Sequence, residues 1–386
     1  MAGSTMLEAA RGLTDTITAR AADTEASRSV PGELADRIGE LGVYRMFVPK
    51  SLGGPEVDPL EAFQIVEALS AADGSTGWTS MILNTTFFAS WLDPTVARDV
   101  LDTKPNSGMA GLFGPLGRAA AAGDGALRLN GRWPFNSGSV HASWFCEGAF
   151  VVDDSGAPRV VDPGRPDWRF MFVPAEEVAI HDNWYVSGLR GTASNDVEIR
   201  DVLVPEERTA SPIFDSAPQD APHFRWSFFA LLSSLMAGFP LGVARRALDE
   251  FVVFAGTKSR GPGPLLADTE TAAIAVSRCD SALKAARAFM VERIGEAWQQ
   301  ALTGDHLTTD QRVNLKSAAL HAMAVGVQAV DTVFALAGGS ALFDHNVIQR
   351  CWRDINAASH HIYFSDDHKA RTGRMLLGRP AEPWMF

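Results

Sequence analysis

Runs of β-branched and aromatic residues, the signature of strands, are confined to the middle third of this chain of 386 residues. They alternate with Gly and other turn residues between about residues 108 and 212, a pattern typical of an all-β domain. On both sides of this part, apolar residues recur at helical spacing. We therefore expect an α+β protein, mostly α, in three parts: an N-terminal helical domain (1–107), a middle β-barrel-like domain (108–215) and a C-terminal four-helix bundle (216–386).

The helical parts carry two more detailed predictions. In the first part, the stretch 77–92 is apolar nearly all round, which predicts one helix buried on most sides. In the last part, breakers at 261–264, 304–305 and 338–339 separate four long periodic segments, as in a four-helix bundle. The fourth of these segments, residues 348–378, is expected to be a single helical segment.

Charge and motif content disfavour several classes of partner and site. Asp and Glu outnumber Lys and Arg by 46 to 34, a net charge of −12, so no nucleic acid and no anionic membrane is expected as a partner. No apolar window is expected to be long enough for a membrane span. The first residues lack the apolar region of a signal peptide, and three cysteines stand far apart, so a reducing, cytoplasmic location is expected.

No familiar metal, nucleotide or hydrolase motif is present. The close histidine pair, His360–His361, would point about 100° apart on a helix and could not share one ion, so no metal site is expected. The glycine-rich strings of Rossmann and P-loop proteins are absent, and so is the GxSxG string of serine hydrolases. The chemistry must therefore come from another arrangement of polar groups.

The stretch GRWPFNSGSVHASWF, residues 131–145, predicts a strand that ends in a corner. The corner FNSG offers two hydroxyls, Ser137 and Ser139, and free backbone amides, while Trp133 and Phe135 supply flat apolar walls. Such walls with a few polar groups at a bend suit a planar ring with polar edges. An ordinary β-hairpin corner with aromatics in the core explains the same residues.

Three further segments place polar or glycine residues at turns. The first is NWYVSGLRGTASNDVEI, residues 183–199, which precedes a strand. The second is a Gly-Gly break in the bundle, where another backbone or a ligand could come very close. The third is a helix end whose cations could bind a phosphate or offset the helix dipole. The residues concerned are Trp184, Thr192 and Ser194 in the first segment, Gly338 and Gly339 in the second, and Arg260 in the third.

Together, the order of domains and four strings resemble the acyl-CoA dehydrogenase fold along nearly the whole chain. In detail they are similar to the two-component flavin-dependent (group D) monooxygenases built on that fold. Each string is weak alone, and together they are fairly specific for the superfamily. The strings are GRWPFNSGS (131–139), WxxxGLRGTASxDV (184–197), VPEER (204–208) and RCWRDINAASHHI (350–362).

The resemblance implies a reduced flavin, FAD or FMN, together with O2 and a separate NAD(P)H:flavin reductase. It also implies a homotetramer that hydroxylates a phenol-like or indole-like molecule through a C4a-hydroperoxyflavin. Arg260 and the Gly-Gly turn would reach the flavin of a neighbouring subunit. The implied cofactor-binding residues are Trp133, Phe135, Ser137, Ser139, Trp184, Thr192, Ser194, Arg260, Gly338 and Gly339.

The residues available for catalysis favour an oxygenase over a dehydrogenase. An acyl-CoA dehydrogenase needs a carboxylate base, yet no Glu occurs between residues 339 and 380, and no acid occurs in 221–248. Asp354, in an Arg-Asp pair, is expected to be structural. The oxygenase branch instead implies a histidine after this pair, and His361 fits its spacing better than His360 does. An imidazole could take a phenol proton or hold an oxygen atom of the hydroperoxide.

Ser137 is the second catalytic residue that the resemblance implies, through a hydrogen bond near the reactive edge of the flavin. Trp78, Asn84 and His360 are expected to line the substrate side, although core packing explains the aromatic residue as well. Three alternatives remain open: an N-oxygenase of an amine, an acyl-CoA dehydrogenase with a displaced base, and a non-catalytic scaffold without affinity for flavin.

Overall fold

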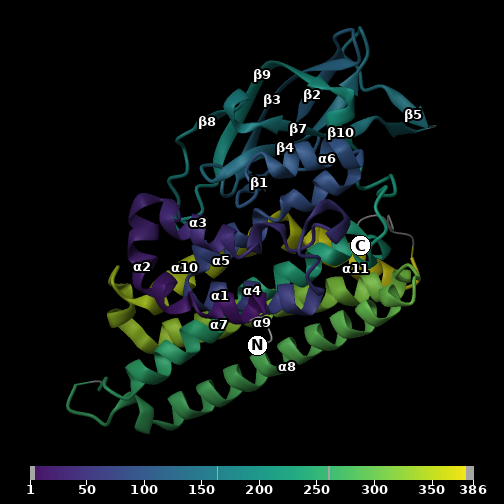
Figure 1. Ribbon diagram of the computed structural model, residues 1–386. Helices are drawn as coiled ribbons and strands as arrows, with labels where there is room; N and C mark the ends of the chain where they lie inside the picture. The colour runs from purple at the N-terminus through teal and green to yellow at the C-terminus, as the bar shows by residue number, and fades with distance from the viewer. Residues whose placement is uncertain (1–4, 163, 260, 380–386) are drawn as a thin grey trace.

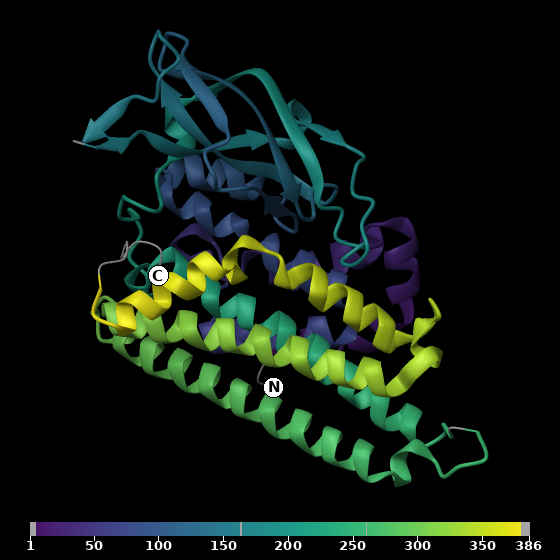
Figure 2. The same cartoon turned by 180° about the vertical axis from the view of Figure 1, so that it is seen from behind.

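The protein is built in layers that follow the order of the chain. The computed structural model describes residues 5–379 except 163 and 260. A β domain lies at one end, the N-terminal helices lie in the middle, and the long C-terminal helices lie at the other end (Figures 1 and 2). One core of buried apolar residues runs through all three parts, from Ala10 to Phe364. The expected fold class, mostly α with a β domain in the middle of the chain, is confirmed.

The N-terminal helices pack against the bundle through close backbone contacts. A Cβ at Gly242 would lie 2.3 Å from the carbonyl oxygen of Glu67, so only glycine permits this helix crossing. Polar side chains cap several of these helices, as Asp58 does by accepting from the Leu60 N–H. The helices are α1 (Met6–Arg11), α2 (Thr14–Ser27), α3 (Gly32–Glu40), α4 (Pro59–Ala72), α5 (Gly74–Ile82) and α6 (Pro94–Asp102).

The single helix expected over 77–92 is wrong. Helix α5 ends at Ile82, and a 3-10 segment, η3 (Thr85–Trp91), follows it. Between them, the Asn84 side chain donates to the carbonyls of Val43 (2.8 Å) and Ser80 (2.9 Å). Side-chain bonds of this kind compete with helical backbone bonds, which explains why the α-helix ends here.

The β domain is one twisted sheet with the strand order β10-β7-β4-β2-β3-β9-β8, with β1 added beside β4. A tight turn that contains Gly123 (φ = 83°) joins β2 and β3 in an antiparallel hairpin. A short ribbon, β5 (Val160–Asp162) with β6 (Arg165–Pro166), stands apart. The strands of the sheet are β1 (Gly108–Ala110), β2 (Gly117–Ala121), β3 (Ala126–Asn136), β4 (Ala142–Val152), β7 (Trp168–Pro174), β8 (Ala179–His181), β9 (Asn195–Pro205) and β10 (Thr209–Ala210).

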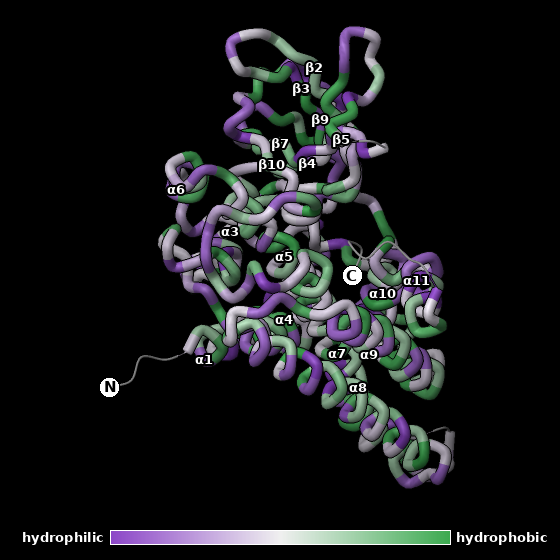
Figure 3. The backbone as a smooth tube through the Cα atoms, turned by 90° about the vertical axis from the view of Figure 1, so that its right-hand side faces the viewer, coloured by the Kyte–Doolittle hydropathy of each residue, from purple (hydrophilic) through white to green (hydrophobic). Residues whose placement is uncertain are grey.

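The C-terminal helices form the bundle, and hydrophobic and hydrophilic stretches alternate along them (Figure 3). Thr269 and Thr308 cap two of these helices by accepting from backbone N–H groups. The helices are α7 (Phe228–Ala255), α8 (Glu270–Leu302), α9 (Thr309–Ala337), α10 (Val347–Ser359) and α11 (Asp366–Leu376).

The fourth predicted bundle segment is not one helix. Helix α10 ends at Ser359, a 3-10 turn, η9 (Ile362–Phe364), follows, and α11 begins at Asp366. His361 has extended backbone angles, and its Nδ1 accepts from the backbone N–H of Tyr363 at 3.2 Å. This local cap replaces the helical bonds, so the chain bends between α10 and α11.

Two segments of the described chain are long and apolar enough for a membrane span by composition, contrary to the sequence prediction. They are Phe228–Ala255 and Thr309–Leu342. The apolar window of the first is 78% buried inside the protein, and that of the second is 44% buried. Burial explains the composition of the first, because a helix at the centre of a bundle is apolar on most sides.

Candidate functional site

The corner between β3 and β4 is pressed against α5 and against the segment before β9. Gly138 has φ = 75°, and its N–H donates to the carbonyl of Thr192 at 2.7 Å. A Cβ at this glycine would lie 2.8 Å from the Leu83 side chain, so no larger residue fits. The N–H groups of Ser137 and Ser139 are used by carbonyls within the corner, at 2.9 and 3.1 Å. The expectation of free amides at residues 137–139 is therefore wrong, and hydroxyls are the polar groups that remain.

Three buried hydroxyls form a chain behind this corner. The Oγ atoms of Ser137 and Ser194 are 2.7 Å apart, and Ser194 Oγ is 2.6 Å from Thr192 Oγ1. Thr192 gives its one proton to the carbonyl of Leu189 at 2.9 Å. Because a hydroxyl carries one proton, Ser194 must donate to Thr192, and Ser137 must donate to Ser194. Ser137 is left with a lone pair and no proton to offer.

Trp78 joins this hydroxyl chain to a histidine of the bundle. Its indole N–H donates to Ser137 Oγ at 3.1 Å. The edge of its ring meets His361, with ring centroids 5.5 Å apart at 70°, and it meets Phe239 at 5.0 Å. The structure thus brings together three predicted site residues that stand far apart in the sequence: Trp78, Ser137 and His361.

His361 is half-buried and sits beside other basic groups. Burial, reinforced by Lys316 and His368, lowers the pKa of His361 to about 4. Burial also lowers the pKa of His368 to about 4. Lys316 is fully buried, and burial lowers its pKa to about 6. This basic cluster has no acidic side chain in hydrogen-bond contact among the described residues.

Phe135 and Trp184 form an aromatic edge beside the corner. Their rings meet edge to face at 6.2 Å, and Phe135 is 65% exposed. The backbone of Phe135 has φ = 61°, a strained region for a bulky residue, where β3 leaves its register with β9. The indole N–H of Trp184 donates to the same Leu189 carbonyl that ends the hydroxyl chain. An exposed aromatic on a strained backbone is typical of a binding surface.

Three predicted roles need correction. Trp133 is fully buried in the β domain, its N–H donates to the Gly148 carbonyl, and its ring packs on Gly117 and Gly131, so it belongs to the core. The polar atoms of Asn84 are all used, because its carbonyl also accepts from the Met46 N–H, so it fixes the N-terminal fold and not a substrate. His360 is exposed and bonded to Asn356, away from the contact with Trp78.

The remaining predicted residues are less tightly joined to the corner. Ser139 donates to the Ala193 carbonyl at 2.8 Å and so holds the corner closed. Gly338 and Gly339 are exposed at the end of α9, and no contact among the described residues joins them to the corner. Gly338 has φ = 63°, and a Cβ on either residue would meet nothing within 4 Å. Arg260 lies outside the described residues.

The sequence did not single out Lys316, and it indicated only a structural role for Asp354. Lys316 stands on the buried stripe of α9, spaced three and four residues from Val313 and Leu320, and a lysine inside an apolar stripe was the available signal. Asp354 was expected to be structural, and it accepts from the Leu189 N–H at 2.6 Å. Burial raises the pKa of Asp354 to about 7. Its carboxyl therefore fixes the loop that ends the hydroxyl chain.

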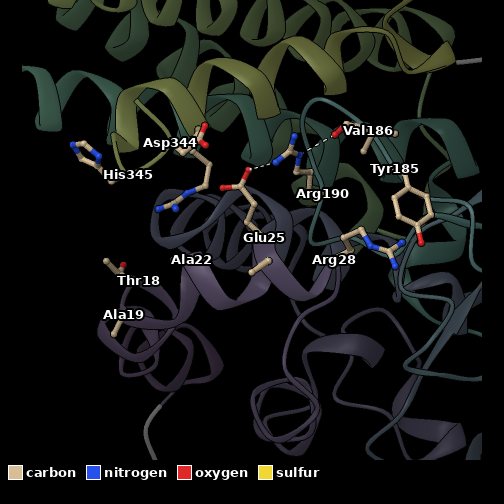
Figure 4. Close-up of a pocket in the computed structure, with 12 residues that line it drawn as sticks. Thr18, Ala19, Ala22, Glu25, Arg28, Tyr185, Val186, Arg190, Asp344 and His345 are labelled. Atoms are coloured by element: carbon tan, nitrogen blue, oxygen red, sulfur yellow. Dashed lines mark hydrogen bonds and ion pairs between the residues drawn. The ribbon is translucent and has the colours of Figure 1, made fainter. Parts of the chain in front are cut away.

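A groove of about 860 Å³ lies between α2, the segment 185–190 and the turn before α10 (Figure 4). Glu25 bridges Arg190 (3.5 Å) and Arg353 (2.5 Å) beside it, and Arg28 pairs with Asp182 at 2.6 Å. None of the predicted site residues lines the groove. These ion pairs fasten the Trp184–Ser194 segment to α2, and so they support the corner from outside.

The corner fits a flat ring with polar edges such as a flavin. Phe135 is exposed and Trp184 is half-buried beside it, and Ser137 offers a lone pair that no other described group uses. No carboxylate contacts Trp78, Ser137 or His361 in the described residues. A carboxylate base for removing a proton next to a thioester is therefore missing at this place.

Comparisons with known proteins show the family of the chain. The sequence matches the N-terminal domain of acyl-CoA dehydrogenase over residues 4–93 and its C-terminal domain over residues 234–366. It is 30% identical to an indole-3-acetate monooxygenase of Pseudomonas putida, over 95% of this chain and 92% of that one. It is 28% identical to the oxygenase component of an FADH2-dependent resorcinol hydroxylase of Rhizobium sp., over 95% and 92%. The crystal structure of the 3-HSA hydroxylase from Rhodococcus sp. RHA1 superposes with a TM-score of 0.90 at 26% identity, covering 100% of this chain and 99% of that one.

Proposed function

Since the chain belongs to the acyl-CoA dehydrogenase family, as one of its flavin-dependent monooxygenases, we propose that it hydroxylates a phenol-like or indole-like molecule. It acts as the oxygenase component of a two-component system and receives reduced flavin from a separate NAD(P)H:flavin reductase. The relatives support a two-component system, because the resorcinol hydroxylase is itself described as an oxygenase component.

The observation that carries the proposal is the path Ser137–Trp78–His361. It places a hydroxyl lone pair of the β domain and an imidazole of the bundle on one indole ring. The aromatic pair of exposed Phe135 and half-buried Trp184 lies on the same corner. A flat ring held against the β domain would thus lie near both polar groups, with Trp78 between them.

Reduced flavin bound here would supply the two electrons needed to activate O2, so that one oxygen atom would enter the substrate and the other would leave as water. Phe135, Trp184 and Ser137 would hold the ring, and Thr192 and Ser194 keep Ser137 in its accepting state. His361 faces the same region with a neutral imidazole, because burial lowers its pKa to about 4.

A homotetramer in the cytoplasm completes the proposal. The bundle exposes large apolar side chains that a single chain leaves in water. Ile362 is 73% exposed and Leu377 is 77% exposed.

Two variants with a matched control test the proposal. Ser137→Ala should weaken binding of reduced flavin about tenfold, since it removes one buried hydrogen bond. His361→Asn should leave that affinity within about twofold and lower the yield of hydroxylated phenol or indole per flavin oxidised by about tenfold. The control, His360→Asn, should change neither, because its side chain is exposed.

Stopped-flow mixing of the complex with O2 and product analysis supply both readouts. A wild-type protein that binds no reduced flavin would refute the proposal. Bleaching of a bound oxidised flavin by an acyl-CoA in the absence of O2 would show a dehydrogenase instead.

A further inference from the structure

Lys316 is a buried amine that pairs with no acidic side chain among the described residues. Its side chain on α9 is 0% exposed, and its Nζ donates to the backbone carbonyl of Tyr363 at 3.3 Å. The same Nζ lies 3.0 Å from the centre of the Tyr363 ring. Buried lysines are rare unless they are paired, so this one calls for a function.

Lys316 is one of several groups that hold Tyr363 in place. The Tyr363 hydroxyl bonds Ser233 on α7, and Ser233 gives its own proton to the Phe229 carbonyl at 2.7 Å. The ring of Tyr363 also stacks on His368 of α11, with centroids 6.0 Å apart. Tyr363 is thus fixed at its hydroxyl, its ring and its carbonyl.

The fixed residue then determines how His361 uses its two ring nitrogens. The backbone N–H of Tyr363 donates to His361 Nδ1 at 3.2 Å, so Nδ1 must keep its lone pair. A neutral imidazole with an accepting Nδ1 carries its proton on Nε2. Nε2 makes no hydrogen bond to another described side chain or backbone group.

We propose that Lys316 is a positioning residue that holds His361 as a neutral imidazole with its proton on Nε2. His361 therefore acts toward the substrate side as a hydrogen-bond donor and not as the base that removes a proton. The inference deepens the proposed function, on which it rests for the identity of the acceptor. It excludes one of the two roles that an imidazole could have at this position.

Electrostatics reinforce the geometry. Lys316 has a pKa of about 6, whereas His361 and His368 have pKa values of about 4. The first proton to enter the cluster therefore goes to Lys316, and its charge then disfavours a second proton on either imidazole. Among the described residues, α5 presents Trp78 and α7 presents Ser233, both uncharged. On α11, Asp367 raises and Arg371 lowers the pKa of His368, so these two charges oppose each other there.

The test uses ¹⁵N imidazole NMR of the full chain without flavin, with the His361 signals assigned from His361→Asn. In the wild type we expect an unprotonated Nδ1 and a protonated Nε2, unchanged between about pH 5 and pH 8. In Lys316→Met the histidine should titrate at higher pH and lose its single tautomer. Its hydroxylation yield should fall at the acidic end of this range, while the affinity for reduced flavin stays within about twofold.

Ser233→Ala separates charge from packing. It removes the hydroxyl contact of Tyr363 and keeps the amine, so the titration of His361 should stay where it is in the wild type. A proton on Nδ1 in the wild type, or an unchanged titration in Lys316→Met, would overturn the inference. Either result leaves the proposed function standing if reduced flavin binds and product forms. Absence of flavin binding would end the proposed function and leave the tautomer assignment intact.

Discussion

The direction of the hydroxyl chain predicts which redox state of a flavin the corner favours. Thr192 gives its proton to the Leu189 carbonyl, and this fixes Ser194 and Ser137 as donors away from the ligand side. A ligand atom placed against Ser137 must then bring its own proton. Reduced flavin carries an N–H on its central ring where oxidised flavin carries a lone pair. Thr192→Val should therefore lower the preference for reduced flavin without touching Ser137.

The size of this preference follows from one hydrogen bond, which reduced flavin can donate to Ser137 and oxidised flavin cannot. A net hydrogen bond contributes about 1 kcal/mol, and a buried acceptor left facing another lone pair costs at least about 1 kcal/mol. The ratio of dissociation constants, oxidised over reduced, should thus contain a factor of about 30 from Ser137. In Thr192→Val, Ser194 has only Ser137 left as an acceptor within the chain, so Ser137 turns its proton outward. That ratio should then fall by at least about tenfold.

Anaerobic titration of the protein with reduced flavin, and aerobic titration with oxidised flavin, measure the ratio. Comparing it between variants cancels the contributions of charge and ring shape that differ between the two flavins. Thr192→Ser restores the hydroxyl and should restore the ratio. Ser139→Ala is the matched control, because its hydroxyl bonds the Ala193 carbonyl outside the chain of hydroxyls. If Thr192→Val binds both flavins with the wild-type ratio, the hydroxyl chain does not set the polarity of Ser137.

Two predictions concern stability. Lys316 keeps no proton in the folded protein above about pH 6, whereas the unfolded chain binds one up to about pH 10.5, so the free energy of unfolding should rise with pH across this window. In Lys316→Met, this rise of the free energy of unfolding with pH should disappear. At neutral pH, thermal melts should show the variant to be more stable than the wild type by at most about 5 kcal/mol. Burial raises the pKa of Glu147 beneath the corner well above its usual value, so Glu147→Gln should preserve or increase stability at neutral pH. Glu147→Ala should lower the free energy of unfolding, measured with urea, by about 1–3 kcal/mol, because the Leu112 N–H loses its acceptor. A Glu147→Gln variant that is less stable than the wild type would contradict a neutral Glu147.

The parts of the fold that sequence could predict are those in which pattern and packing agree. The strands around Trp133 alternate cleanly, and the bundle helices carry long apolar stripes, so the order of helices, sheet and helices was accessible. The same logic located the corner with Ser137, because glycine and serine follow directly on a strand. These are local signals that need no knowledge of distant neighbours.

The errors arise where a side chain from elsewhere determines the backbone. Asn84 ends α5 by bonding Val43 and Met46, about forty positions earlier in the chain. His361 caps its own turn and so breaks the helix that the pattern predicted through it. Trp133 looked like a ligand wall because it stands beside the corner, yet alternation along β3 turns it into the core. Contacts with residues so distant in sequence cannot be predicted from the spacing of apolar residues along the chain.

Residues that do not touch the ligand set the polarity of the proposed site. On one side of Trp78, Thr192 commits Ser137 to offering a lone pair. On the other side, Tyr363, held by Lys316, commits His361 to offering a proton. Trp78 keeps the two groups apart, because its N–H is already given to Ser137 and its edge faces the imidazole. Ser137 as an acceptor and His361 as a donor, on the two sides of Trp78, can bind two different atoms at the same time. The residues that line the substrate can therefore change with the substrate, while the buried residues Thr192, Tyr363 and Lys316 stay the same.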